Sequence, residues 1–98
     1  MRERVNVPHV VSIEKAVLTF YEKTELREAD ILALFGCSRF KAWELKHKAL
    51  ERMKEKDVIR YDAHSVETVC AYESWGLNID DLEKRLIKLR KFQKAVTA

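Results

Sequence analysis

The stretch from residue 29 to residue 45 constrains the fold most, because it predicts two helices joined by a tight turn. The first part is short and apolar and ends at Gly36, a residue that adopts left-handed backbone angles without steric cost. Ser38 is suited to accept a hydrogen bond from an amide of the following turn, so a second helix begins there. This layout is that of a helix-turn-helix unit.

Glycine and proline are scarce, with two Gly and one Pro among 98 residues. An all-β fold needs such turn residues at short intervals, so the scarcity favours helices with brief connections. A chain of this length builds one domain with a single modest core. We therefore expect an all-α fold with at most one short strand, in which a three-helix core holds the helix-turn-helix and two further helices follow.

Apolar spacing and capping residues place the first three helices of this fold. The first follows Ser12 and ends near Lys23, and the second spans about 25–35 behind Thr24. The third runs from residue 39 to about residue 56, with a buried stripe at three- and four-residue steps.

The C-terminal third of the chain predicts one strand and two helices. Residues 57–62 are β-branched and aromatic, as in a short strand. Ser65 caps the next helix, which Gly76 ends, and a last helix begins near Ile79 and continues to about Ala95. The expected organisation is one domain over 1–98, made of a helical core at 12–56 with the helix-turn-helix at about 26–56, a strand-like connection at 57–64 and C-terminal helices at 65–98.

Basic residues gather in the predicted third helix and in the last one. Residues 39–60 hold eight basic and four acidic side chains, and residues 80–94 hold six basic and three acidic ones. Residues 12–30 instead carry three basic and five acidic side chains. A polyanion would bind where basic charge is concentrated. An ordinary solvated helix face has the same pattern, so charge alone leaves both interpretations open.

Binding of DNA by a helix-turn-helix uses the early residues of its second helix, which reach base edges while flanking groups bind phosphates. Candidates here are the residues predicted to lie away from the buried stripe of the third helix. They are Arg39, Phe40, Lys41, Trp43, Glu44 and Lys48.

Each candidate type has a matching group on duplex DNA. Arg39 and Lys41 can donate to guanine or phosphate, and Glu44 can accept from cytosine. Phe40 can contact a thymine methyl group, and the Trp43 indole N–H can donate to a phosphate. In the alternative, the two helices belong to a plain helical bundle, with Phe40 and Trp43 in its core.

Residues 36–45 (GCSRFKAWEL) resemble the turn and second helix of MerR-like and excisionase-like DNA-binding domains. Those domains often read Gly, a β-branched residue, Ser, Arg, two variable residues, a small or branched apolar residue and an aromatic one. Residues 60–66 (RYDAHSV) resemble their strand-to-helix step, and the likeness covers about residues 26–70. A similar arrangement occurs in small terminase subunits of tailed phages.

The resemblance implies a sequence-specific DNA-binding protein of a phage or mobile element, a regulator or an excisionase-like recombination accessory. Its partner would be double-stranded DNA, with the helix from Arg39 in the major groove. The family's DNA-contacting role would fall on Arg39, Phe40, Lys41, Trp43 and Glu44. The alternative function is that of a small helical structural or packaging subunit of a phage, such as a terminase small subunit or a head–tail assembly protein.

The last predicted helix carries a heptad-like apolar seam at steps of three and four residues. Helix-turn-helix proteins usually read two half-sites with two copies, so the seam predicts a homodimer. The candidate dimerisation residues are Ile79, Leu82, Leu86 and Leu89. The alternative is that this stripe packs on the core of its own domain.

Catalysis and metal binding find little support in the residues. Cys37 with His47 and His64 with Cys70 are the imaginable pairs, but the chain has no Cys-x-x-Cys or His-x-x-x-His spacing. We expect no enzyme activity, no cofactor, no metal and no small-molecule substrate.

Membrane and export signals are also missing from the sequence. Its apolar runs fall short of the ~20 residues that span a bilayer. Residues 1–8 lack the apolar core of a signal peptide. We therefore expect a cytoplasmic protein that does not bind membranes, with Cys37 and Cys70 as reduced thiols.

Overall fold

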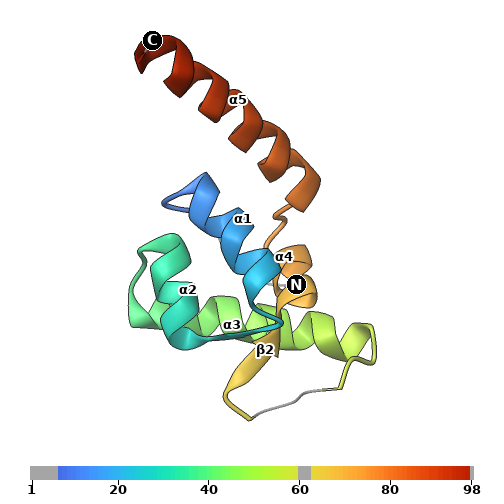
Figure 1. The fold of residues 1–98 in the computed structure, drawn as a ribbon. Coiled ribbons are helices and arrows are strands. Elements are labelled where there is room, and N and C mark those ends of the chain that lie inside the picture. Colours follow the sequence, from blue (N-terminus) through green and yellow to red (C-terminus); the bar gives the residue numbers. More distant parts are fainter. Residues whose placement is uncertain (1–6, 60–62, 98) are drawn as a thin grey trace.

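The computed structural model describes residues 7–59 and 63–97. Helices dominate these residues, as the sequence predicts, and one short antiparallel strand pair accompanies them (Figure 1). In chain order the elements are α1 (Ile13–Glu22), β1 (Glu25–Arg27), α2 (Glu28–Phe35), α3 (Arg39–Glu55), β2 (Ser65–Glu67), α4 (Thr68–Ser74) and α5 (Ile79–Thr97).

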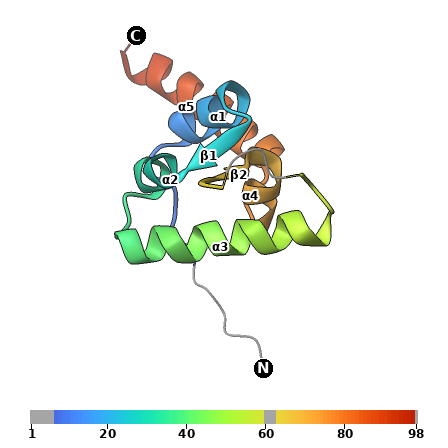
Figure 2. The same ribbon diagram turned by 90° about the horizontal axis from the view of Figure 1, so that it is seen from below.

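Helix α3 forms one edge of the molecule, with α2 and α4 packed on its inner side and α1 and α5 beyond them (Figure 2). Helix α5 packs against α1 with its first half, and its second half extends past the body (Figure 1). The long outer side of α3 therefore faces away from the rest of the described chain.

The core lies between α3 and the other helices. The predicted buried stripe of α3 is confirmed and consists of Ala42, Leu45, Ala49 and Met53. Its two alanines let the neighbouring helices approach closely. Helix α2 adds Ile31 and Leu34, and α4 adds Tyr72, whose buried hydroxyl donates to the Ala16 carbonyl oxygen of α1 at 2.7 Å.

The strands correct the sequence-based prediction. The strand expected at 57–62 does not form over the described residues 57–59, where Asp57 has a positive φ of 55°, and residues 60–62 lie outside the described part. Strand β2 instead lies at 65–67 and pairs antiparallel with β1. At the centre of the pair the buried Leu26 stands opposite the buried Val66, so two strands are present where one was expected.

Strand pairing also shifts the starts of two helices. Helix α2 begins at Glu28, later than predicted, because the residues after Thr24 pair as β1. Its first turn is held by Asp30, whose carboxylate accepts from the Arg27 backbone N–H at 2.9 Å. The predicted Thr24 cap is therefore wrong.

Helix α4 likewise begins at Thr68, and Ser65, the predicted cap, lies in β2. The Glu67 carboxylate accepts from the backbone N–H groups of Val69 and Cys70, at 2.6 and 3.0 Å. The caps predicted for α1 and α3 are confirmed: Ser12 accepts from the Lys15 amide and Ser38 from the Lys41 amide.

The turn between α2 and α3 has the predicted left-handed glycine. Gly36 has φ 60° and ψ 33°, and its N–H donates to the Leu32 carbonyl oxygen at 2.8 Å. The N-terminal segment closes over this turn, since the Val11 N–H donates to the Leu34 carbonyl oxygen at 2.9 Å. The start of α3 is thus fixed by its own cap and by the segment that precedes α1.

Candidate nucleic-acid interface

Trp75, the residue that follows α4, contacts the inner side of helix α3. The Trp75 indole N–H donates to the Leu45 carbonyl oxygen at 2.9 Å. The same ring meets Phe35 of α2 edge-on, with ring centroids 5.2 Å apart. Because both contacts are buried, α3 has a defined position relative to α2 and α4.

Three of the predicted DNA-contacting residues project from α3 into solvent. The Arg39 side chain is 89% exposed, and Phe40 and Trp43 are 70% and 53% exposed. The structure therefore rules out the alternative in which Phe40 and Trp43 lie in the core of a bundle.

The other three predicted residues, on the neighbouring side of α3, are less accessible. Lys41 and Glu44 have side chains 27% and 25% exposed and form an ion pair at 3.6 Å. Lys48 is half-buried on the same side of the helix. The candidate set thus divides into an outward group that begins at Arg39 and a half-buried charged group.

Sequence reasoning missed His47, which completes the outward group. Its imidazole lies 3.9 Å, centroid to centroid, from the Trp43 ring, and its Nδ1–H donates to the Trp43 carbonyl oxygen at 3.0 Å. Phe40 also stacks on Trp43, with ring centroids 6.2 Å apart and an interplanar angle of 18°. The sequence could have shown this, because Trp43 and His47 are four residues apart and therefore lie on one side of the helix.

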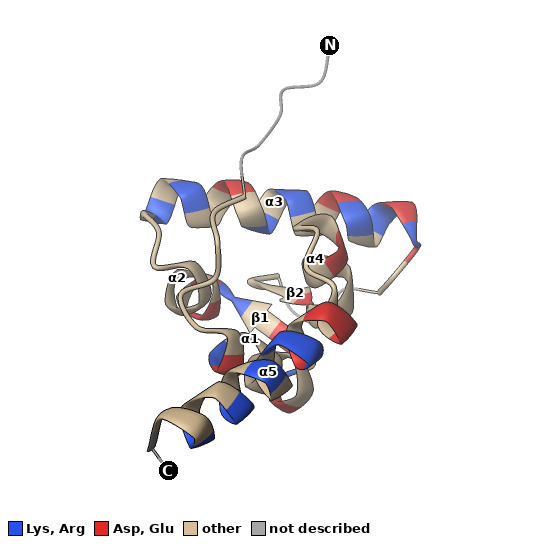
Figure 3. Cartoon of the chain, turned by 90° about the horizontal axis from the view of Figure 1, so that it is seen from above, with Lys and Arg blue, Asp and Glu red and all other residues tan. Residues whose placement is uncertain are grey.

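Basic residues occur along the whole of α3 and alternate with acidic ones (Figure 3). Near the end of the helix, Arg52 and Lys56 bind the Glu73 carboxylate of α4 at 3.6 and 2.8 Å. The Lys56 ammonium, with help from Arg52, lowers the pKa of Glu73. At the start of the helix, Arg39 forms a long 3.7 Å ion pair with Glu28 of α2, and its side chain is 89% exposed. Exposed positive charge is therefore present at the beginning of α3, on Arg39, and near its end, on Lys54.

The candidate dimerisation residues do not share one environment. Leu82 and Leu86 are buried in the chain's own core, Ile79 is half-buried and Leu89 is exposed. Tyr21 of α1 donates a hydrogen bond to Glu83 on the same stretch of α5. A seam between two copies that used all four residues would have to displace this packing, so pairing through α5 stays a prediction.

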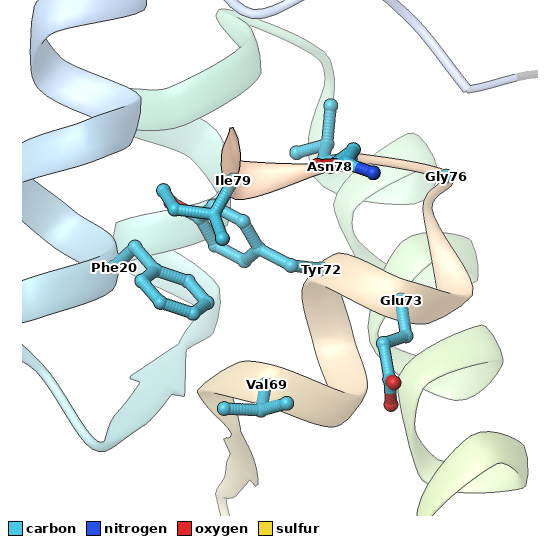
Figure 4. Close-up of a pocket in the computed structure, with 8 residues that line it drawn as sticks. Phe20, Val69, Tyr72, Glu73, Gly76, Asn78 and Ile79 are labelled. Atoms are coloured by element: carbon cyan, nitrogen blue, oxygen red, sulfur yellow. The ribbon is translucent and has the colours of Figure 1, made fainter. Parts of the chain in front are cut away.

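A hollow of about 440 Å³ lies between α1, α4 and the start of α5 (Figure 4). Phe20 and Ile79 give it an apolar wall. Its polar groups already have partners: the Tyr72 hydroxyl donates to α1, Glu73 is bound by α3, and the Asn78 side-chain oxygen accepts from the Asp80 and Asp81 amides. The hollow therefore offers apolar surface and no obvious polar anchor for a ligand.

The two cysteines lie apart from any cluster of metal ligands. Burial is the main cause that raises the pKa of the Cys70 thiol to about 11, and Cys37 is half-buried in the α2–α3 turn. Over residues 7–59 and 63–97, no three His, Cys, Asp or Glu side chains come close enough together to hold a metal ion. In the same residues, no helix has the length and apolar character to cross a membrane.

Comparison with known proteins adds no relative to these observations. No family model, curated protein or solved structure matches the chain. The outward face of α3 is therefore interpreted from its own geometry and chemistry.

Proposed function

We propose that this chain binds duplex DNA in a sequence-specific way through the outer face of α3, with the helix entering the major groove from Arg39 onward. The observation that carries the proposal is the exposure of Arg39, Phe40 and Trp43 directly after a left-handed turn. Large aromatic side chains gathered at a surface indicate a contact that covers them. An arginine beside them suits base edges and phosphates.

The charge at the start of α3 supports a polyanionic partner. The positive end of the helix dipole favours acidic residues in the first turn, as Asp80 and Asp81 provide in α5. The first turn of α3 has no acid and carries Arg39 and Lys41. These two cations lie at the positive end of the helix dipole, which destabilises the helix when no ligand is bound. A phosphate bound there would offset this repulsion.

The arrangement around α3 fits the role of a helix laid into a groove. Helix α3 has 17 residues, about 25 Å at 1.5 Å per residue, and lies at an edge of the molecule (Figure 2). An α-helix fits the major groove, which is about 12 Å wide. The role of regulator or excisionase-like recombination accessory in a phage-like element rests on the resemblance of residues 36–45 to those domains.

Fluorescence anisotropy with labelled mixed-sequence duplex DNA, at low and at physiological salt, tests the proposal. Binding should weaken steeply with salt, because Lys and Arg release counterions from the phosphates. The Arg39→Ala/Lys41→Ala double variant should bind much more weakly and with a shallower salt dependence.

The matched control is Lys15→Ala/Lys84→Ala, which removes the same charge from exposed positions on α1 and α5. It should leave most of the affinity in place. Equal losses in both double variants, or no binding by the folded wild type at low salt, would overturn the proposal.

A second candidate, the structural or packaging subunit of a phage, is favoured by one observation on α5. Its second half exposes apolar side chains that duplex DNA does not require: Ile87, Leu89, Phe92 and Val96. Sedimentation velocity without DNA tests this function. Assembly into large defined oligomers, weakened by Phe92→Lys, would support it, and a monomer or dimer at all concentrations would not.

A further inference from the structure

The outward group on α3 contains three aromatic rings in contact, here called the aromatic row: Phe40, Trp43 and His47. The Phe40 and Trp43 rings are nearly parallel, and the His47 ring is held beside Trp43 by its hydrogen bond to the Trp43 carbonyl oxygen. The row is therefore an ordered surface rather than three independent side chains.

Apolar surface continues from the end of the row. A hollow of about 420 Å³ opens beside His47, and its lining combines the apolar Leu50, Met53 and Val58 with the charged Glu51 and Lys54. Together with the exposed rings of Phe40 and Trp43, it gives this side of α3 more apolar surface than a helix that meets only phosphates would need.

Basic residues stand at both ends of this side of the helix. Five residues follow one another at steps of four, four, three and four, which places them on one side of α3: Arg39, Trp43, His47, Leu50 and Lys54. Arg39 and Lys54 are exposed and are about 22 Å apart along the axis at 1.5 Å per residue. The apolar centre with cationic ends is complementary to a DNA groove bordered by phosphates.

The row has the length of a short run of base pairs. Phe40 and His47 are seven residues apart, about 10 Å along the helix. Base pairs stack at about 3.4 Å, so the row can face about three of them. On the major-groove edges of the bases, the distinctive apolar group is the 5-methyl group of thymine.

We propose that the aromatic row selects duplexes whose major groove presents thymine methyl groups, or other 5-methylpyrimidines, over about three successive base pairs. This inference rests on the proposed function, because it names what the same helix face recognises. The rings bury the methyl groups, and Arg39 and Lys54 bind the phosphates on either side.

Replacing thymine by uracil tests the inference, because uracil lacks only the methyl group. Short duplexes of alternating dA and dT are compared by anisotropy with duplexes of alternating dA and dU. Each methyl group that the row buries is worth about fourfold in affinity, so the loss of about three of them should weaken binding of the dU duplex by about 60-fold. Methylation of cytosine at C5 in an alternating dG–dC duplex places the same methyl group in the major groove, so it should strengthen binding.

Variants of the row identify the reading side chains. Phe40→Ala and Trp43→Ala should bring the ratio of dT to dU affinity close to one. Phe92→Ala is the matched control, since it removes another exposed phenyl group, on α5, and it should keep the wild-type ratio. Circular dichroism checks that each variant is folded, which the exposure of both residues leads us to expect.

The outcomes separate this inference from the proposed function. Equal affinity for dT and dU duplexes would overturn methyl recognition and leave DNA binding by α3 standing. A dT preference that survives Phe40→Ala and Trp43→Ala would also overturn it, since another element would then be the reader. Absence of binding to all four duplexes would overturn both, and the aromatic row would then be a protein-binding surface.

Discussion

The indole N–H of Trp75 donates to the backbone carbonyl oxygen of Leu45, 2.9 Å away in the middle of α3. The bond joins the end of α4 to the inner side of the helix whose outer side carries the candidate interface. Since the Trp75 ring also packs edge-on against Phe35 of α2, one side chain positions α3 relative to two other helices.

Trp75→Phe should therefore destabilise the fold. The variant keeps an aromatic ring, loses the N–H donor and leaves a smaller ring in a packed site, at a cost of about 1–3 kcal/mol. Urea unfolding followed by circular dichroism measures the change. Trp43→Phe, at an exposed position of α3, should alter stability by less than about 0.5 kcal/mol. Similar losses in the two variants would contradict the position given to Trp75.

Gly36→Ala should destabilise the chain more than Gly76→Ala. Both glycines have positive φ, 60° and 72°, where an L side chain costs about 1–2 kcal/mol. A Cβ on Gly36 would also lie 3.0 Å from the Val11 Cγ1 atom, whereas one on Gly76 meets nothing within 4 Å. Thermal unfolding of both variants gives the difference. In a Val11→Ala background the excess cost at Gly36 should disappear, and its persistence would argue against this crowding.

Part of the loss of stability on acidification should come from protonation of Asp30. Burial by itself raises the pKa of this carboxyl, but the Arg27 backbone N–H and the Lys23 ammonium outweigh burial and hold it below its usual value. A carboxyl whose pKa is lower in the folded state stabilises the fold above its unfolded pKa, about 3.9, and that contribution is lost as pH falls further.

Urea unfolding of Asp30→Asn at neutral and acid pH checks this sign. The variant should be less stable than wild type at neutral pH, and the difference should shrink below about pH 4. Glu51→Gln, which removes an exposed carboxylate on α3, is the control and should change stability at neutral pH by less than about 0.5 kcal/mol. A constant gap between Asp30→Asn and wild type at all pH values would contradict the assignment.

The two thiols should differ in reactivity. Cys70 is fully buried, and its pKa of about 11 leaves little thiolate at neutral pH, whereas Cys37 is partly exposed. A thiol reagent should modify Cys37 quickly and Cys70 only after the protein unfolds. Cys37→Ser should abolish the fast reaction. A fast reaction that remains in Cys37→Ser would show that Cys70 is accessible.

Local signals in the sequence predicted much of the helical part of the fold. Gly36 as a left-handed terminator and Ser12 and Ser38 as caps act through neighbours within four residues, so their roles can be read from the chain alone. The same holds for the buried stripe of α3, since helical periodicity determines which residues share a side.

The strand pair could not be predicted in this way. Leu26 and Val66 are 40 positions apart, and each strand has three residues, too few to show an alternating pattern. Their pairing depends on tertiary packing, and it displaced the caps predicted at Thr24 and Ser65. For the site, periodicity separated outer from inner residues, but it could not show that Lys41 would pair with Glu44 at a half-buried position.

The two tryptophans allow the most direct test of DNA binding by α3. Their indole N–H signals, followed by NMR during titration with duplex DNA and assigned with Trp43→Phe, report an exposed group on the proposed interface and a buried one behind it. We predict that the Trp43 signal shifts or broadens with added DNA while the Trp75 signal stays nearly unchanged. Binding of DNA with the Trp43 signal unmoved would contradict the assignment of α3 as the interface.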